Sequence, residues 1–153
     1  MNALAPGSPA GALERARRSD LVGIHSLLNQ HSLPSGDITE DSLDHFLVYR
    51  DEIGVAGGIV ALERYEDVAL LRSLVVADRY GGRGLGRRLV AAAEELAQEL
   101  HVPHIYLLTT TAESYFDSVG FRTISRENAP SVLKQCSQFK TLCPTTAVLM
   151  VKP

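Results

Sequence analysis

A glycine-rich segment at residues 81–86 has the residue types and spacing best suited to chemistry in this chain. It follows an apolar run from Val68 to Val76 and precedes a stretch whose apolar residues have helical spacing. Strand, glycine turn and helix start together predict an anion site, because the first N–H groups of a helix have no internal partner and the helix dipole favours negative charge. Glycines also let a phosphate approach the backbone closely. We therefore expect a phosphate-bearing ligand at this segment.

Two common phosphate-binding motifs do not fit the segment. A dinucleotide fingerprint needs glycines at its first, third and sixth positions, and the two registers that have the first two, from Gly82 and from Gly84, place Arg87 and Leu89 at the sixth. The glycine spacing of a Walker A loop occurs between Gly81 and Gly86, but Arg87 and Arg88 follow where lysine and a hydroxyl residue are required. The segment therefore matches neither nucleotide-binding motif, and the prediction of an anion site still holds.

The predicted helix from Leu85 to about Leu100 carries its charges in an unusual order. Arginines crowd its start and glutamates its second half, whereas the helix dipole favours the opposite by ~0.3–1 kcal/mol per charge. A bound polyanion explains the inversion, and a solvated helix with tolerated charges is the alternative. The charged residues are Arg83, Arg87, Arg88, Glu94, Glu95 and Glu99, and the apolar side expected to face a sheet is Leu85, Leu89, Val90, Ala93, Leu96, Ala97 and Leu100.

Glycine, proline and charged turns divide the rest of the chain into short elements. Tight connections between successive strands predict an antiparallel meander ahead of the glycine segment. The expected fold class is α/β (α+β), with a mixed, mostly antiparallel central sheet flanked by helices. Residues 1–11 are expected to be a flexible tail, and residues 12–153 a single domain. The predicted strands are 13–16, 46–49, 53–62, 68–76, 104–108, 121–124 and 146–151, and the predicted helices are 21–28 with Asp20 as N-cap, 39–45, 85–100, 112–118 and 129–139.

Composition narrows the class of protein. The 153 residues are 45% apolar and 22% charged, which suits a globular core, and a net charge of −3 argues against a nucleic-acid-binding protein. Without a signal peptide or a membrane-length apolar run, a cytoplasmic protein with no membrane partner is expected. Two cysteines, Cys136 and Cys143, are too few for a disulfide framework, and the five histidines lack metal-ligand spacing, so no metal is predicted.

The glycine segment resembles the phosphate loop of the GCN5-related N-acetyltransferase (GNAT) superfamily, whose pattern is Arg/Gln-x-x-Gly-x-Gly/Ala. Gly84, Leu85 and Gly86 match its end, whereas Gly81 stands where the family usually has arginine or glutamine. Gly120-Phe121 follows in the family's register, and the resemblance covers residues 12–152. It implies the GNAT fold, with acetyl-CoA as cosubstrate.

The resemblance also implies which residues hold that cosubstrate. Loop amides would bind the pyrophosphate, and a backbone N–H at the end of the preceding strand would stabilise the thioester oxygen as an oxyanion hole does. The implied cofactor-binding residues are Leu74, Val75, Val76, Gly81, Gly82, Arg83, Gly84, Leu85, Gly86, Arg87 and Phe116.

Narrower resemblances concern the acceptor. Segments 70–73, 107–112 and 139–147 are similar to acetyltransferases of bacterial arsenic-resistance operons. The Leu-Thr-Thr segment followed by Tyr115-Phe116 is similar to the acetyltransferase domain of N-acetylglutamate synthases. Both imply a small amino-acid-like acceptor. Whether the chain forms a homodimer is left open.

Two residues are candidates for acid–base catalysis. Many relatives carry a tyrosine general acid four residues before the glycine of Gly-Phe, where this chain has Phe116. Tyr115 precedes it and is either that acid or a residue of the pocket rim. A glutamate base of some relatives falls on Leu70, so Glu63 is the alternative base, acting through water, unless it is merely a glutamate of the turn. An α-amino group of pKa ~8 is partly neutral without any base.

Arg72 interrupts an otherwise apolar strand and therefore needs a partner. It either binds a substrate carboxylate through two parallel hydrogen bonds or forms an ion pair with Glu63 across the hairpin. Ser73, Thr109 and Thr110 are expected to line the acceptor pocket, with Thr111 capping the following helix. A non-catalytic acetyl-CoA-binding module is the competing function, because the usual tyrosine and glutamate are both missing.

Overall fold

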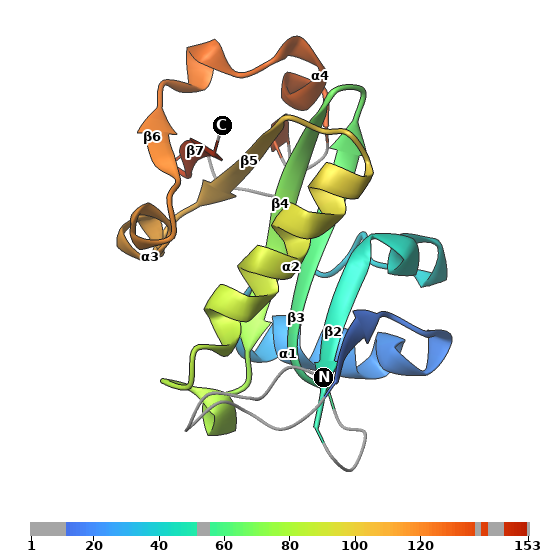
Figure 1. The fold of residues 1–153 in the computed structure, drawn as a ribbon. Coiled ribbons are helices and arrows are strands. Elements are labelled where there is room, and N and C mark those ends of the chain that lie inside the picture. The colour runs from blue at the N-terminus through green and yellow to red at the C-terminus, as the bar shows by residue number, and fades with distance from the viewer. Residues whose placement is uncertain (1–11, 52–55, 137–138, 141–145, 153) are drawn as a thin grey trace. The chain divides into compact units, whose positions relative to one another are not determined.

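In the computed structural model, the described residues are 12–51, 56–136, 139–140 and 146–152. Within them the chain forms a seven-stranded sheet of order β1-β2-β3-β4-β5-β7-β6 (Figure 1). The strands are β1 Ala12–Arg15, β2 Phe46–Arg50, β3 Ala56–Tyr65, β4 Val68–Val76, β5 His104–Thr109, β6 Arg122–Ile124 and β7 Val148–Lys152.

The helices connect these strands. The α-helices are α1 Leu21–Gln30, α2 Leu85–Glu99, α3 Glu113–Ser118 and α4 Ser131–Lys134, and the 3-10 helices are η1 Arg18–Asp20, η2 Glu40–His45, η3 Asp78–Tyr80 and η4 Arg126–Asn128.

The sheet is mixed, as predicted. β1 pairs with β2, β2 with β3, β5 with β7 and β6 with β7, all antiparallel, whereas β4 and β5 are parallel. A parallel pair needs a crossover connection, and α2 supplies it. The order of elements and the pairing confirm the expected fold class.

The chain divides into two compact units, which are described separately. The first comprises Met1–Ala61 and Ser73–Ala93, and the second comprises Leu62–Arg72 and Glu94–Pro153. The strands β3 and β4 and the helix α2 therefore each contribute residues to both units.

Each unit has its own apolar cluster. In the first unit, α1 buries Ile24, Leu27 and Leu28, whose helical spacing places them on one face. The rest of that cluster is Ile38, Leu43, Phe46, Val48, Ile59, Ala61, Val75 and Ala77. In the second unit, Leu133 and Cys136 pack with Val68 and Leu70, and the partly buried residues around them are Tyr65, Tyr106, Val132 and Phe139.

Two predicted elements have bounds that differ from the structure by three residues or more. The strand expected at 53–62 is β3, which continues to Tyr65 and ends at a turn at Glu66, a residue with φ +57°; residues 53–55 lie outside the described residues. Of the helix expected at 129–139, the structure has Ser131–Lys134 as α4, which begins after Pro130, and residue 139 is π-helical. Residues 137–138 lie outside the described residues.

A buried ion-pair network, missed by the sequence, fixes the start of the first unit. Asp20 occupies the predicted N-cap of α1, but its carboxylate makes no capping bond to the helix. It accepts instead from the Arg17 backbone N–H at 2.6 Å and from Arg50 Nε at 3.0 Å and Nη2 at 2.5 Å. Arg50 also donates to Glu14 at 2.6 Å. Asp20 and Arg50 are both buried, so each charge needs the other as its counter-ion.

We expect Asp20→Asn to destabilise the protein by about 3 kcal/mol at pH 7, because it leaves the buried Arg50 without its main counter-ion. Burial acts to raise the pKa of Asp20, but hydrogen bonds from Arg50 and Arg17 outweigh it and hold the pKa below its usual value. A lowered folded-state pKa gives stability that is present above the unfolded-state pKa of ~3.9 and lost as the pH falls further.

The measurement is the free energy of unfolding by urea between pH 7 and pH 2. The gap between the two proteins should shrink below about pH 4. Asp41→Asn, at an exposed position of η2, is the control and should change little. A gap that is the same at pH 2 as at pH 7 would contradict this role of the Asp20 charge.

Candidate active site

The loop after β4, in the first unit, presents a row of backbone N–H groups. Gly82 and Gly84 have φ values of +75° and +77°, a left-handed conformation that favours glycine. Among the described residues, none of the backbone N–H groups from Gly82 to Arg87 has a hydrogen-bond acceptor, and the first such bond of the following turn is from Arg88 N to Gly84 O at 3.2 Å. These six amides are the donors that an anion would need.

Tyr80 anchors the residues just before this loop. Its hydroxyl donates to Asp51 at 3.1 Å, and its ring meets the buried Tyr49 edge-on, with centroids 5.3 Å apart. The ring lies so close to Gly57 that a Cβ at that glycine would be 2.4 Å from Tyr80 Cε2. The glycine of β3 therefore makes room for the tyrosine that fixes the entry of the loop. This anchor was not predicted from the sequence, since its parts are far apart in the chain.

The first turn of α2 packs closely against β3 in the same unit. A Cβ at Gly58 would lie 3.0 Å from Leu89 Cδ1 and 3.1 Å from Leu85 Cδ2. Both leucines are fully buried, as the apolar face of the predicted helix required. This contact fixes the direction of the helix start, and with it the direction of the loop amides.

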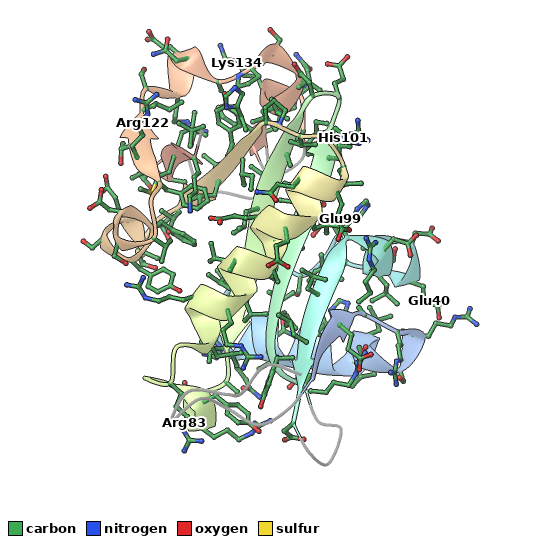
Figure 2. The ribbon with its side chains drawn as sticks, in the orientation of Figure 1. Glu40, Arg83, Glu99, His101, Arg122 and Lys134 are labelled. Atoms are coloured by element: carbon green, nitrogen blue, oxygen red, sulfur yellow. The ribbon has the colours of Figure 1, made fainter. Side chains whose placement is uncertain are left out.

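The arginines of η3, of the loop and of the first turn of α2 differ in their contacts. The guanidinium carbon of Arg79 lies 5.0 Å from the ring centroid of Tyr80, and that of Arg88 lies 5.8 Å from the ring centroid of Tyr49. Both arginines therefore contact the aromatic rings that hold the entry of the loop. Arg83 and Arg87 are exposed and have no ion-pair partner among the described residues. Figure 2 shows Arg83 on the loop and Glu99 in the last turn of the helix. The inverted charge order predicted from the sequence is therefore present, with two cations available to a phosphate.

Ser73 marks a kink in β4. Its φ of +60° is a left-handed conformation that serine rarely adopts. Strain of this kind, about 1–2 kcal/mol, collects at functional sites. After the kink, Val75 is buried, while Leu74 and Val76 are half-buried. Their backbone was predicted to face the thioester, and that assignment stays a prediction.

The pairing of β4 with β5 is short. Within the second unit the parallel register runs from Val68–His104 to Leu70–Tyr106 and then ends, although β5 continues to Thr109. Beyond that point β5 pairs only with β7, up to Thr109–Val148. The parallel register therefore ends at Leu70, two residues before Arg72.

Arg72 and Glu63 form an ion pair in the second unit. Arg72 Nη1 lies 3.5 Å from Glu63 Oε2, and the arginine side chain is only 5% exposed, against 21% for the glutamate. Tyr65 donates its hydroxyl to the other glutamate oxygen, Oε1, at 3.1 Å. Of the two partners considered for Arg72, the structure shows the glutamate across the hairpin. Glu63 is therefore held between a cation and a phenol rather than exposed in a turn.

One of the three threonines at the end of β5 and just after it differs from its prediction. The N-cap position of α3 is Ala112, so Thr111 is not its cap, and that interpretation was wrong. Thr109 accepts the Ala112 N–H at 3.0 Å instead, because its hydroxyl lies three residues back in a tight turn. Thr110 is exposed. Both remain candidates for lining the acceptor pocket.

Tyr115 and Phe116 lie on α3, also in the second unit. Phe116 is buried and contacts Tyr115 and Phe121 edge-on, with centroids 5.4 and 5.7 Å away. The Tyr115 hydroxyl oxygen is inaccessible to solvent. Next to them, Lys152 donates to the Val119 carbonyl at 2.9 Å and pairs with Glu94. This lysine, which the sequence did not single out, fixes the turn that carries Gly120, a residue with φ +102°.

Other features are absent from the described residues. No group of three or more histidine, cysteine, aspartate or glutamate side chains comes together there as a metal site. No helix in the described part of the chain is long and apolar enough to cross a membrane. Cys136 is a buried free thiol that packs in the second unit's cluster. Cys143 lies outside the described residues.

Comparison with known proteins connects these features to a family. The model of the acetyltransferase (GNAT) family matches residues 13–121. An uncharacterised N-acetyltransferase from Chlorobaculum tepidum is 29% identical over 118 residues, which are 76% of this chain and 74% of that protein.

Solved structures share the fold. N-acetylglutamate synthase from Neisseria gonorrhoeae, complexed with coenzyme A and N-acetyl-glutamate, superposes with a TM-score of 0.80 and 20% identity over 92% of this chain. This chain spans only 34% of that synthase. Rv2747 from Mycobacterium tuberculosis, in complex with CoA and NLQ, also gives a TM-score of 0.80, with 20% identity over 92% of this chain and 98% of its own.

Proposed function

Since the chain belongs to the acetyltransferase (GNAT) family and is an acetyl-CoA-dependent N-acetyltransferase, we propose that its acceptor is a small amino-acid-like molecule with a carboxylate beside its amine. The observation that carries this proposal is Arg72, a buried cation on a strand that is otherwise apolar up to that point. A buried arginine recognises carboxylates in a directional way, because its N–H groups form a planar fork.

The cosubstrate half of the proposal rests on the first unit. The unpartnered amides from Gly82 to Arg87 fit the pyrophosphate of CoA, and Arg83 and Arg87 add positive charge beside it. The kink at Ser73 supports a special role for the backbone that follows, from Leu74 to Val76. We assign the thioester oxygen to a backbone N–H of this stretch, where it would be stabilised as negative charge develops.

The acceptor half of the proposal rests on the second unit. Arg72 would bind the carboxylate, and Glu63 would take a proton from the ammonium. The neutral amine then attacks the thioester carbon, the new C–N bond forms, and the C–S bond breaks to release the thiolate. Thr109 and Thr110 would line the pocket. Tyr115 is kept as the proton donor to the thiolate or as a residue of the pocket rim.

The acceptor class has support from outside the chain. The gonococcal synthase, which shares the fold, was solved with N-acetyl-glutamate. A molecule of this kind carries a carboxylate beside its acetylated nitrogen, which is the arrangement that Arg72 would recognise. The arsenic-operon resemblance of residues 70–73 and 107–112 extends the proposal to arsenic-bearing analogues of glutamate.

A thiol-release assay tests the function. Purified protein, acetyl-CoA and a panel of L-amino acids, with a glutamate-like organoarsenical included, should give free CoA with one or a few members. The methyl ester of an active amino acid should react poorly, because esterification removes the carboxylate. Esters that react as well as the acids would contradict the acceptor class. A rise in melting temperature with acetyl-CoA but no thiol release from any member would favour a non-catalytic binding module.

A further inference from the structure

We propose that Asp51 is a positioning residue for acetyl-CoA, because its carboxylate holds η3 and so fixes the start of the glycine loop before the ligand binds. The proposal rests on the proposed function, since it needs the pyrophosphate at the backbone amides from Gly82 to Arg87. It deepens that assignment by naming a residue that lies outside the loop and that the sequence did not indicate.

Asp51 binds two side chains of η3 through the same oxygen. The Tyr80 hydroxyl donates to Asp51 Oδ2 at 3.1 Å, and Arg79 Nη2 lies 3.6 Å from that atom. The aspartate side chain is 14% exposed, whereas that of Arg79 is half-exposed. Arg79 Nη2 also donates to the carbonyl of Ala56, in β3, at 3.2 Å. One carboxylate therefore tethers two of the three residues of η3.

The strand end that carries Asp51 is itself fixed. Asp51 directly follows Arg50, the last residue of β2, which is buried and pairs with the buried Asp20. Arg50 also pairs with Glu14 of β1. These ion pairs tie the end of β2 to β1 and η1, all within the first unit. A carboxylate next to a fixed strand end restricts the groups that bind to it.

The glycine loop needs such a fixed starting point. Four of the six residues at 81–86 are glycine, the residue that loses the most conformational freedom when it is ordered. A ligand that has to order such a segment binds more weakly by the entropy lost. Because the Gly81 N–H donates to the Asp78 carbonyl at 3.0 Å, the loop begins directly from η3. Holding η3 therefore places the first residue of the loop in advance.

The negative charge of Asp51 gives the proposal a definite sign. A carboxylate near a phosphate site repels a polyanion, so by charge alone the loss of Asp51 should strengthen the binding of acetyl-CoA. Positioning predicts the opposite, because the loss releases η3 and leaves more of the loop to be ordered by the ligand. A weaker binding of acetyl-CoA would therefore not be explained by the change in charge.

The test is Asp51→Ala, which removes both contacts with η3. We expect the dissociation constant of acetyl-CoA, measured by calorimetry, to rise about tenfold, the order expected for losing a hydrogen bond to a charged group. The acceptor KM should hardly change. Asp44→Ala is the matched control, because it removes the same charge from an exposed position of η2 in the same unit, and it should bind acetyl-CoA normally. Unchanged or tighter binding by Asp51→Ala would overturn the proposal.

Two conservative variants test the hydrogen bond even if Asp51→Ala does not fold. Asp51→Asn keeps an oxygen that accepts from Tyr80, so it should keep most of the affinity for acetyl-CoA. Tyr80→Phe loses the donor but keeps the ring against Tyr49, so it should bind acetyl-CoA nearly as weakly as Asp51→Ala. A large loss in Asp51→Asn with none in Tyr80→Phe would contradict a role through this hydrogen bond.

A double-mutant cycle shows whether Asp51 acts through Tyr80. In a Tyr80→Phe background, Asp51→Ala should raise the dissociation constant of acetyl-CoA by no more than about twofold further, because an ion pair with the half-exposed Arg79 is weak. An equal tenfold loss in both backgrounds would mean that Asp51 acts by another route, and the proposal would be overturned.

Failure of this proposal is distinguishable from failure of the proposed function. If Gly84→Asp abolishes the binding of acetyl-CoA while Asp51→Ala binds it as tightly as the unchanged protein does, only the positioning role is overturned. If Gly84→Asp binds acetyl-CoA normally, the phosphates lie elsewhere, and the positioning role is overturned together with the loop assignment. The acceptor class is decided separately, by thiol release with the panel of amino acids.

Discussion

Replacement of Gly84 by aspartate should abolish the stabilisation of the protein by acetyl-CoA. For the unchanged protein, ligand at a hundred times its dissociation constant adds about 2.7 kcal/mol to the free energy of unfolding, which is several degrees in melting temperature. The variant places a carboxylate at the loop whose amides are assigned to the pyrophosphate. Two negative groups in contact repel each other, and the added side chain also fills the space of the phosphate.

The variant should still fold. A Cβ at Gly84 would find no atom within 4 Å in the protein itself. The φ of +77° is unfavourable for most side chains, but aspartate and asparagine tolerate it best. The measurement is the melting temperature by differential scanning fluorimetry, with and without acetyl-CoA.

Gly84→Asn is the matched control, because it has the same size and backbone preference without the charge. It should keep part of the acetyl-CoA response, and the difference between the two variants should shrink as salt is added. A complete response of Gly84→Asp to acetyl-CoA would show that the phosphates bind elsewhere.

The second large effect is expected at Arg72. Arg72→Ala should raise the acceptor KM about a hundredfold, equivalent to about 2.7 kcal/mol, because a buried carboxylate would lose its cation. The KM for acetyl-CoA should hardly change, since loss of acceptor binding acts on the acceptor alone. Arg72→Lys should restore activity only in part, because an ammonium lacks the planar fork.

The control for this variant is Arg64→Ala, on the same hairpin. Arg64 is exposed and donates to the Glu66 carbonyl at 3.0 Å, so its loss should affect neither KM. Initial rates of thiol release at varied acceptor and varied acetyl-CoA give both constants. Unfolding of Arg72→Ala and Arg72→Lys alike, seen by circular dichroism, would make Arg72 a structural member of the ion pair with Glu63 and reopen the acceptor class.

Much of the fold could be predicted because local signals were strong. The apolar run at 68–76 has the bounds of β4, and the loop and the buried face of α2 follow from glycine spacing and helical periodicity. The bounds of elements were harder to predict. Of residues 129–136, all of which were expected to be helical, the structure has only Ser131–Lys134 as α-helix, beginning after Pro130.

The candidate site was predictable in part, for a related reason. Glu63 and Arg72 could be paired from the sequence, because they lie on consecutive strands with a short turn. Tyr65 escaped notice although it is only two residues from Glu63. A tyrosine at a strand end is ordinary in sequence, and its role depends on which oxygen of a carboxylate it reaches. The positive φ of Ser73 has no sequence signal at all, because serine seldom adopts it.

The close approach of Gly57 to Tyr80 has a consequence for how this protein can diverge. A side chain at position 57 cannot coexist with the aromatic ring at position 80, since even a methyl group would overlap the ring edge. Any larger residue at 57 therefore requires a smaller one at 80, and the hydrogen bond to Asp51 is then lost as well. The two positions are constrained to change together. Among descendants of this sequence, the strand glycine and the tyrosine before the loop form one inherited unit.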